Sequence, residues 1–101
     1  MSRNYAREKF GSAVEYMATS AQSLHDRLHS AYLMFSPVSE KDFADPREKE
    51  IFEEIQSILT REDAVGDEGR VRASLNKMTD DEASSLASLI VSLDLMLSSH
   101  D

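Results

Sequence analysis

Residues 79–98, TDDEASSLASLIVSLDLMLS, are a long and mostly apolar stretch, and they predict the helix around which the chain folds. Thr79 and Glu82 form a capping box, in which each side chain bonds the other residue's backbone N–H. A helix of this length spans about 30 Å, the width of a small domain, so we expect other helices to pack around it. Its apolar residues recur at three- and four-residue spacing, as on one buried face: Ala83, Leu86, Leu89, Ile90, Leu93, Met96 and Leu97.

Three large apolar residues do not fit the predicted core of a single chain. Val91 and Leu95 lie outside the apolar face of the last helix, and Leu33 points away from the apolar face of the second. We expect these three to form an exposed apolar patch, which favours a protein partner or a homodimer.

The first half of the chain predicts two amphipathic helices, at about 4–19 and 20–35. The break between them is inferred from cap-forming side chains at Thr19 and Ser20, because no Gly or Pro intervenes. Without that break the two helices would merge into a rod of about 45 Å, which a monomer of this size could not cover. Such a rod would require a dimer.

The middle of the chain predicts a third helix and two short elements. Pro37 ends the second helix, and Ser39 can cap a single turn over 39–43. Asp45, Pro46 and Glu48 supply a cap, a first-turn proline and a capping-box acid for a helix over 46–60. A charged loop containing Gly66 and Gly69 precedes a short helix over about 68–77, which Asp67 can cap.

Together these elements predict an all-α fold, a compact antiparallel bundle of four main helices within a single domain, residues 1–101. The chain has 101 residues, with no Cys, 3 Gly and 2 Pro. It therefore lacks disulfides and thiolate metal sites, and it has few of the breakers that an all-β fold needs. We see no secretory signal and no apolar run long enough to span a membrane, so we expect a cytoplasmic protein with no membrane contact.

The net charge of -8 is concentrated in the second half of the chain. An acidic chain does not suit non-specific binding to nucleic acid, which requires a basic face. The acids over residues 40–54 would form a solvated surface that keeps the protein soluble. The alternative is a docking face for a basic partner, or a mimic of a nucleic-acid backbone. The candidates on that acidic face are Glu48, Glu50, Glu53 and Glu54.

One motif resembles a metal site. His25, Asp26 and His29 follow the H-x-x-x-H spacing of helical zinc ligands, with Asp where zinc proteases have Glu. No third ligand is marked out, and His100 lies at the chain end. The alternative is that both histidines pack at the rim of the core, and we therefore expect no metal or other cofactor.

No nucleophile elbow, phosphate-binding Gly loop or EF-hand spacing occurs in this sequence. We therefore expect a non-enzymatic interaction or regulatory protein, with no catalytic residues. The only basic cluster that suggests a DNA-recognition helix is Arg70, Arg72 and Lys77, and acids surround it.

Three segments together resemble a group of small uncharacterised bacterial all-α proteins. These are Tyr5-Ala6-Arg7-Glu8-Lys9, Gly66-Asp67-Glu68-Gly69-Arg70 and Met78-Thr79-Asp80-Asp81-Glu82-Ala83. The resemblance implies a free-standing bacterial protein, and it transfers no activity and no site residues.

Overall fold

The computed structural model describes residues 3–99, which form five α-helices and one short 3-10 helix with no strand. The elements are α1 (Arg3–Thr19), α2 (Leu24–Phe35), η1 (Glu40–Asp42), α3 (Pro46–Leu59), α4 (Gly66–Lys77) and α5 (Asp80–Ser98). The prediction of an all-α bundle is confirmed.

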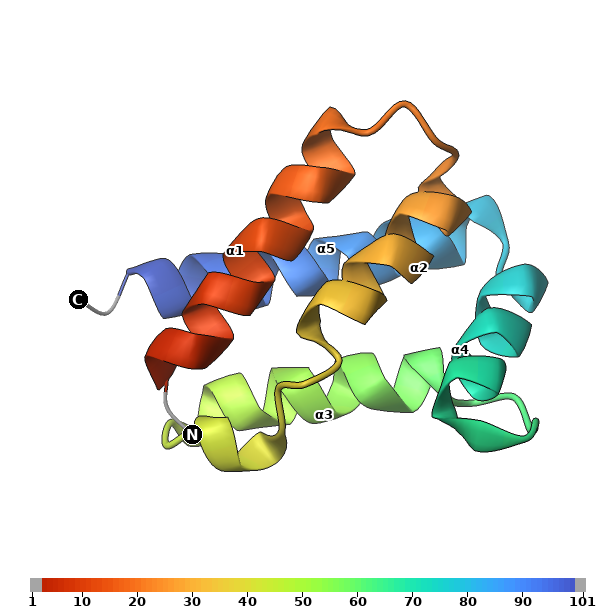
Figure 1. Ribbon diagram of the computed structural model, residues 1–101. Helices are drawn as coiled ribbons and strands as arrows, with labels where there is room; N and C mark the ends of the chain where they lie inside the picture. The colour runs from red at the N-terminus through yellow and green to blue at the C-terminus, as the bar shows by residue number, and fades with distance from the viewer. Residues whose placement is uncertain (1–2, 100–101) are drawn as a thin grey trace.

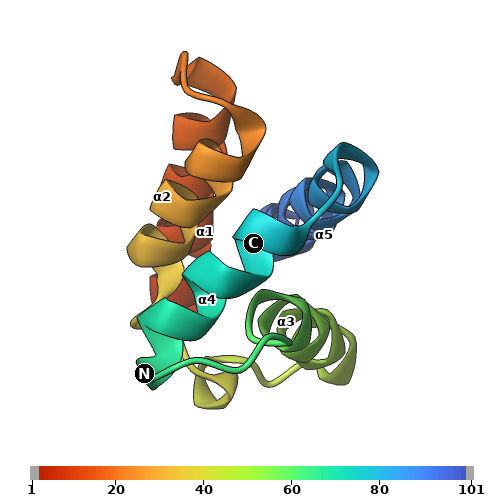
Figure 2. The same ribbon diagram turned by 90° about the vertical axis from the view of Figure 1, so that its right-hand side faces the viewer.

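The helices form two antiparallel pairs that cross each other (Figure 1). The hairpin of α1 and α2 lies over the pair of α3 and α5, and α4 closes one end of the bundle (Figure 2). The last helix packs against α1, α2 and α3, as we expected, whereas α4 packs mainly against α2 and α3. The Cα radius of gyration is 12.8 Å, the value expected for a folded domain of about 100 residues.

The four phenylalanines form the centre of the core. The ring of Phe10 stacks on Phe35 with centroids 4.5 Å apart, and it meets Phe52 edge-on at 6.1 Å. Phe43 follows η1 and packs on Phe52 at 4.9 Å, so the turn that Ser39 caps places a residue in the core. The last helix contributes Ala83, Leu86, Ile90, Leu93 and Leu97, all fully buried.

The second helix begins four residues later than predicted, at Leu24 rather than at 20. The reason is local: the Ser20 hydroxyl accepts from the Gln22 N–H, and the Ser23 hydroxyl accepts from the Asp26 N–H. Such side-chain bonds to the backbone compete with helix formation and favour a turn. The two helices are therefore separate, and the alternative of one continuous rod is wrong.

Two predicted cap assignments are also wrong. The short helix predicted over 68–77 begins at Gly66, and Asp67 lies in its first turn instead of capping it. Gly66 has a φ of 76°, which glycine adopts without strain. At α3, the Asp45 side chain accepts from the Arg47 N–H, but Glu48 does not complete a capping box. The capping box of Thr79 and Glu82 is present.

Candidate functional site

The outer face of α5 carries the most exposed of the large apolar side chains that we singled out. Leu95 is 62% exposed and Val91 is 36% exposed, one helical turn apart. They share the solvent side of α5 with Ser84, Ser88 and Ser92, which are also exposed. Small neighbours leave this surface flat, so the backbone of an approaching helix could come close to it.

Leu33 is 46% exposed and lies on a different helix, α2. It lies on α2 opposite Leu28, Ala31 and Phe35, which face the core. Each of these two helices buries its other side in the shared core. Leu33 on α2 and Leu95 on α5 therefore both point away from the core, but from separate helices. The three residues do not line up along one helix, and a binding role for any of them stays a prediction.

The predicted acidic face of α3 loses one of its four members. Glu50, Glu53 and Glu54 are exposed, but Glu48 is fully buried. Glu48 falls in register with Phe52, Ile55 and Leu59, and this register turns it into the protein. Its assignment to the exposed acidic face was therefore wrong.

The carboxylate of Glu48 is held by an arginine at the start of the first helix. Arg3 Nη2 lies 3.0 Å from Glu48 Oε2 and donates a second bond of 3.0 Å to the Met96 carbonyl. Among the described residues, Glu48 Oε1 has no hydrogen-bond partner. The arginine thus joins α1, α3 and α5 at one point, which the sequence could not reveal because the partners are 45 and 93 residues apart.

Another acid of the 40–54 run is buried as well. Asp42 is 4% exposed, and its side chain accepts a 2.9 Å hydrogen bond from the Ser39 N–H. Burial alone would raise the pKa of Asp42, but hydrogen bonding that includes the Ser39 N–H holds that pKa below its ordinary value. Asp42 is therefore part of the turn and does not belong to a free acidic surface.

The two histidines of the predicted metal motif lie between α2 and α4. His25 Nε2 is 3.0 Å from the Met78 carbonyl oxygen, to which it donates, whereas His29 Nε2 is buried without a hydrogen-bond partner in residues 3–99. They line a small cavity of about 20 Å³ with Asp26 and Arg72. Within the described part of the chain, no three His, Cys, Asp or Glu side chains are grouped to hold a metal ion. His100 lies outside the described residues.

The three basic residues of α4 do not gather on one face. Lys77 Nζ lies 3.3 Å from Glu62 Oε1, and Arg72 lines the histidine cavity. Arg70 instead faces a hollow between α2, α3 and α4. This distribution gives no support to a DNA-recognition helix.

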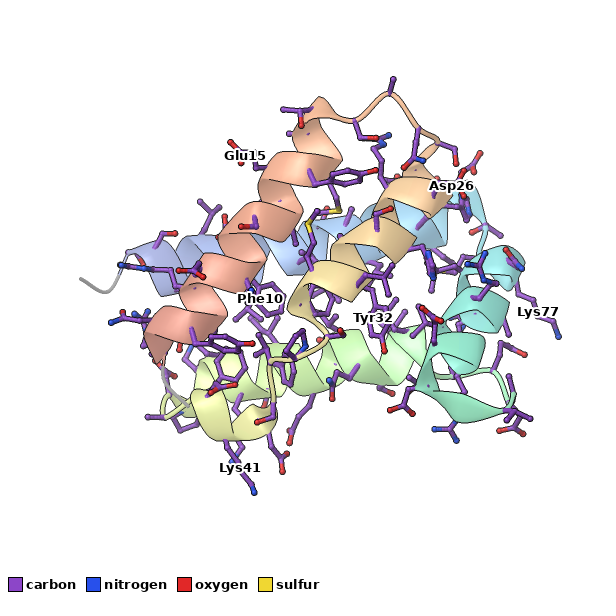
Figure 3. All side chains as sticks on the ribbon, viewed as in Figure 1. Phe10, Glu15, Asp26, Tyr32, Lys41 and Lys77 are labelled. Carbon is purple, nitrogen blue, oxygen red and sulfur yellow. The ribbon has the colours of Figure 1, made fainter. Side chains whose placement is uncertain are left out.

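Among the hollows of the described residues, two bring together residues that the sequence offered no reason to connect. An open groove of about 730 Å³ runs between α1 and α5, where Asp94 faces Gly11. A smaller hollow of about 190 Å³ lies where α2, α3 and α4 meet, and Figure 3 shows Tyr32 pointing from α2 toward it. Both are lined by residues from separate helices, so no local sequence signal could have identified them.

Comparisons with protein-family models, with curated proteins and with solved structures found no match to this chain. The resemblance to small bacterial proteins therefore stays a prediction. Within residues 3–99, no helix has the length and apolarity needed to cross a bilayer.

Proposed function

We propose that this protein is a non-enzymatic interaction module, and that it binds a protein partner through the outer face of α5. The observation that carries the proposal is the exposure of Leu95 and Val91 on the same face of a helix whose other side is fully packed. Burying one leucine side chain at an interface stabilises a complex by about 1.5–3 kcal/mol. The proposal includes a cytoplasmic location, which we expect from the sequence.

A second copy of the chain is the first partner to test. Sedimentation velocity over a range of concentrations should show a reversible dimer for the unaltered protein. Leu95→Ser should raise the dimer Kd by at least about tenfold, because it removes most of the apolar contact. Leu33→Ser is the matched control, since it removes an exposed leucine from α2 and should leave the Kd unchanged.

A heterologous partner would be detected by affinity purification from the native cell. In that case the unaltered protein and Leu33→Ser should retain the same partner, and Leu95→Ser should lose it. If the chain is monomeric at every concentration and Leu95→Ser retains every partner of the unaltered protein, α5 is not the interaction surface.

A second candidate function is capture of a basic partner by α3. It is favoured by Glu50, Glu53 and Glu54, which are exposed and have no ion pair within the described residues. Binding through these acids should weaken steeply as salt rises, because exposed charges are screened. Glu50→Gln with Glu53→Gln should reduce that salt dependence, whereas the matched pair Glu8→Gln with Glu15→Gln on α1 should not.

A further inference from the structure

The hollow between α2, α3 and α4 brings together polar groups from three helices. It is lined by Tyr32, Gln56, Leu59, Thr60, Asp67 and Arg70 and has a volume of about 190 Å³. At about 30 Å³ per molecule of liquid water, that space equals about six waters, so it suits a very small ligand.

Most of the polar side chains in this hollow have unused hydrogen-bonding capacity. In residues 3–99, no hydrogen bond or ion pair is made by the side chains of Tyr32, Gln56, Asp67 or Arg70. Thr60 differs, because its hydroxyl donates a 2.7 Å bond to the Gln56 carbonyl. Leu59 supplies a buried apolar wall.

Two opposite charges lie on the rim of the hollow without pairing with each other. Asp67 and Arg70 are three residues apart on α4, a spacing that normally favours an ion pair, yet no ion pair joins them in the described structure. Arg70 is half-buried and can donate two parallel N–H bonds to a carboxylate. Asp67 is exposed and can accept an ammonium group.

The hydroxyl of Tyr32 is a donor in this setting. Burial, with the charges of Asp67 and Glu68, raises the pKa of Tyr32 above its ordinary value, so the hydroxyl keeps its proton at neutral pH. The ring is fixed by an edge-on contact with Phe35, at a centroid distance of 5.9 Å. The hydroxyl can therefore donate to an oxygen atom of a ligand that enters the hollow beside Arg70.

We propose that this hollow binds a small zwitterion, a free α-amino acid, with its carboxylate on Arg70 and Tyr32 and its ammonium group on Asp67. A simple anion would meet repulsion from Asp67, and a simple cation would meet repulsion from Arg70. A ligand that carries both charges on adjacent carbon atoms satisfies both residues. The volume of the hollow admits only the smallest amino acids, those with about five to eight non-hydrogen atoms in the whole molecule. The site is independent of the outer face of α5.

The test is a chemical-shift titration of the isotope-labelled full chain. Glycine, L-alanine, L-serine and L-threonine are the probes, with acetate and methylamine as comparators that each carry one of the two charges. We expect at least one amino acid to give saturable shifts at Tyr32, the Gln56 side-chain amide and Arg70, with a Kd in the millimolar range. Acetate and methylamine should bind more weakly.

Substitutions then separate the two charged contacts. Arg70→Gln should weaken binding by about tenfold, since it removes a charge-assisted pair. Asp67→Asn should weaken it by about threefold, because an exposed carboxylate is screened by solvent. Arg72→Gln is the control, since it removes the same charge from the side of α4 that faces the histidine cavity, and it should have no effect.

Unchanged circular dichroism of each variant shows that α4 is still folded. The proposal is overturned if none of the four amino acids gives saturable shifts with the unaltered protein. It is also overturned if acetate binds as tightly as the amino acids, or if Arg72→Gln weakens binding as much as Arg70→Gln.

Discussion

Arg3 Nη2 lies 3.0 Å from Glu48 Oε2, in a position where the glutamate is completely buried and the arginine side chain is 26% exposed. A buried carboxylate is stable only when it is paired and hydrogen-bonded, since loss of hydration is expensive. The same guanidinium also donates to the Met96 carbonyl. One side chain from the first turn of α1 therefore fixes both α3 and α5.

Removing Arg3 should leave an uncompensated charge inside the protein. We expect Arg3→Met to lower the free energy of unfolding by about 2–3 kcal/mol, less than the roughly 3–5 kcal/mol for a fully buried pair, because the arginine is partly exposed to solvent. Urea denaturation followed by circular dichroism measures the change.

The matched control is to neutralise the glutamate in the same background. Arg3→Met with Glu48→Gln should recover part of the loss, because no buried charge then remains unpaired. A loss below about 0.5 kcal/mol for Arg3→Met alone would mean that the ion pair does not stabilise the fold.

The contribution of the α5 capping box to the stability of the protein should depend on pH. The hydrogen bond from the Thr79 N–H is the main contact that lowers the pKa of Glu82 below 4.5, with Arg61 adding to it. A carboxyl whose pKa is lower in the folded state stabilises the protein above its unfolded pKa, and that contribution disappears as pH falls through the folded pKa. Glu82→Gln should therefore lower the melting temperature at pH 7, and the difference from the unaltered protein should vanish in strong acid.

Asp94 should show the opposite dependence on pH. Burial raises the pKa of Asp94 above 3.8, since the ionised carboxylate is poorly solvated in the groove between α1 and α5. Its favourable contribution is thus present below the unfolded pKa and is lost as pH rises through the folded pKa. Asp94→Asn should raise the melting temperature at pH 7 relative to the unaltered protein. A lower melting temperature for Asp94→Asn would contradict this assignment.

Replacing each of the two glycines of α4 by alanine should change the stability of the protein in opposite directions. Gly66 has a φ of 76°, so Gly66→Ala should destabilise the protein by about 1 kcal/mol, although the added methyl group would meet no other atom. Gly69 has no such backbone constraint, and a Cβ there would lie 3.6 Å from the Ala64 Cβ, an ordinary contact. Gly69→Ala should therefore stabilise the helix by about 0.5 kcal/mol. Thermal unfolding of both variants gives the comparison.

The sequence was sufficient to predict the helices and most of the core because their signals are local. Apolar spacing identified the face of α5 that carries Leu86 and Ile90, and the exposed positions of Val91 and Leu95 followed from the same periodicity. The capping box at Thr79 was also predicted, since both partners lie within one turn. The start of α2 was misplaced because two serines, Ser20 and Ser23, each accept a backbone N–H and compete to cap it.

The positions of Glu48 and of its partner Arg3 were decided by tertiary structure alone. Nothing near Glu48 in the sequence shows that Arg3 is its partner, and an acid on a polar helix is expected to face solvent. Likewise, Tyr32 and Arg70 share a hollow only because three helices meet there. Helix formation depends on residues three or four apart, whereas burial of a charge depends on which distant side chain arrives to compensate it.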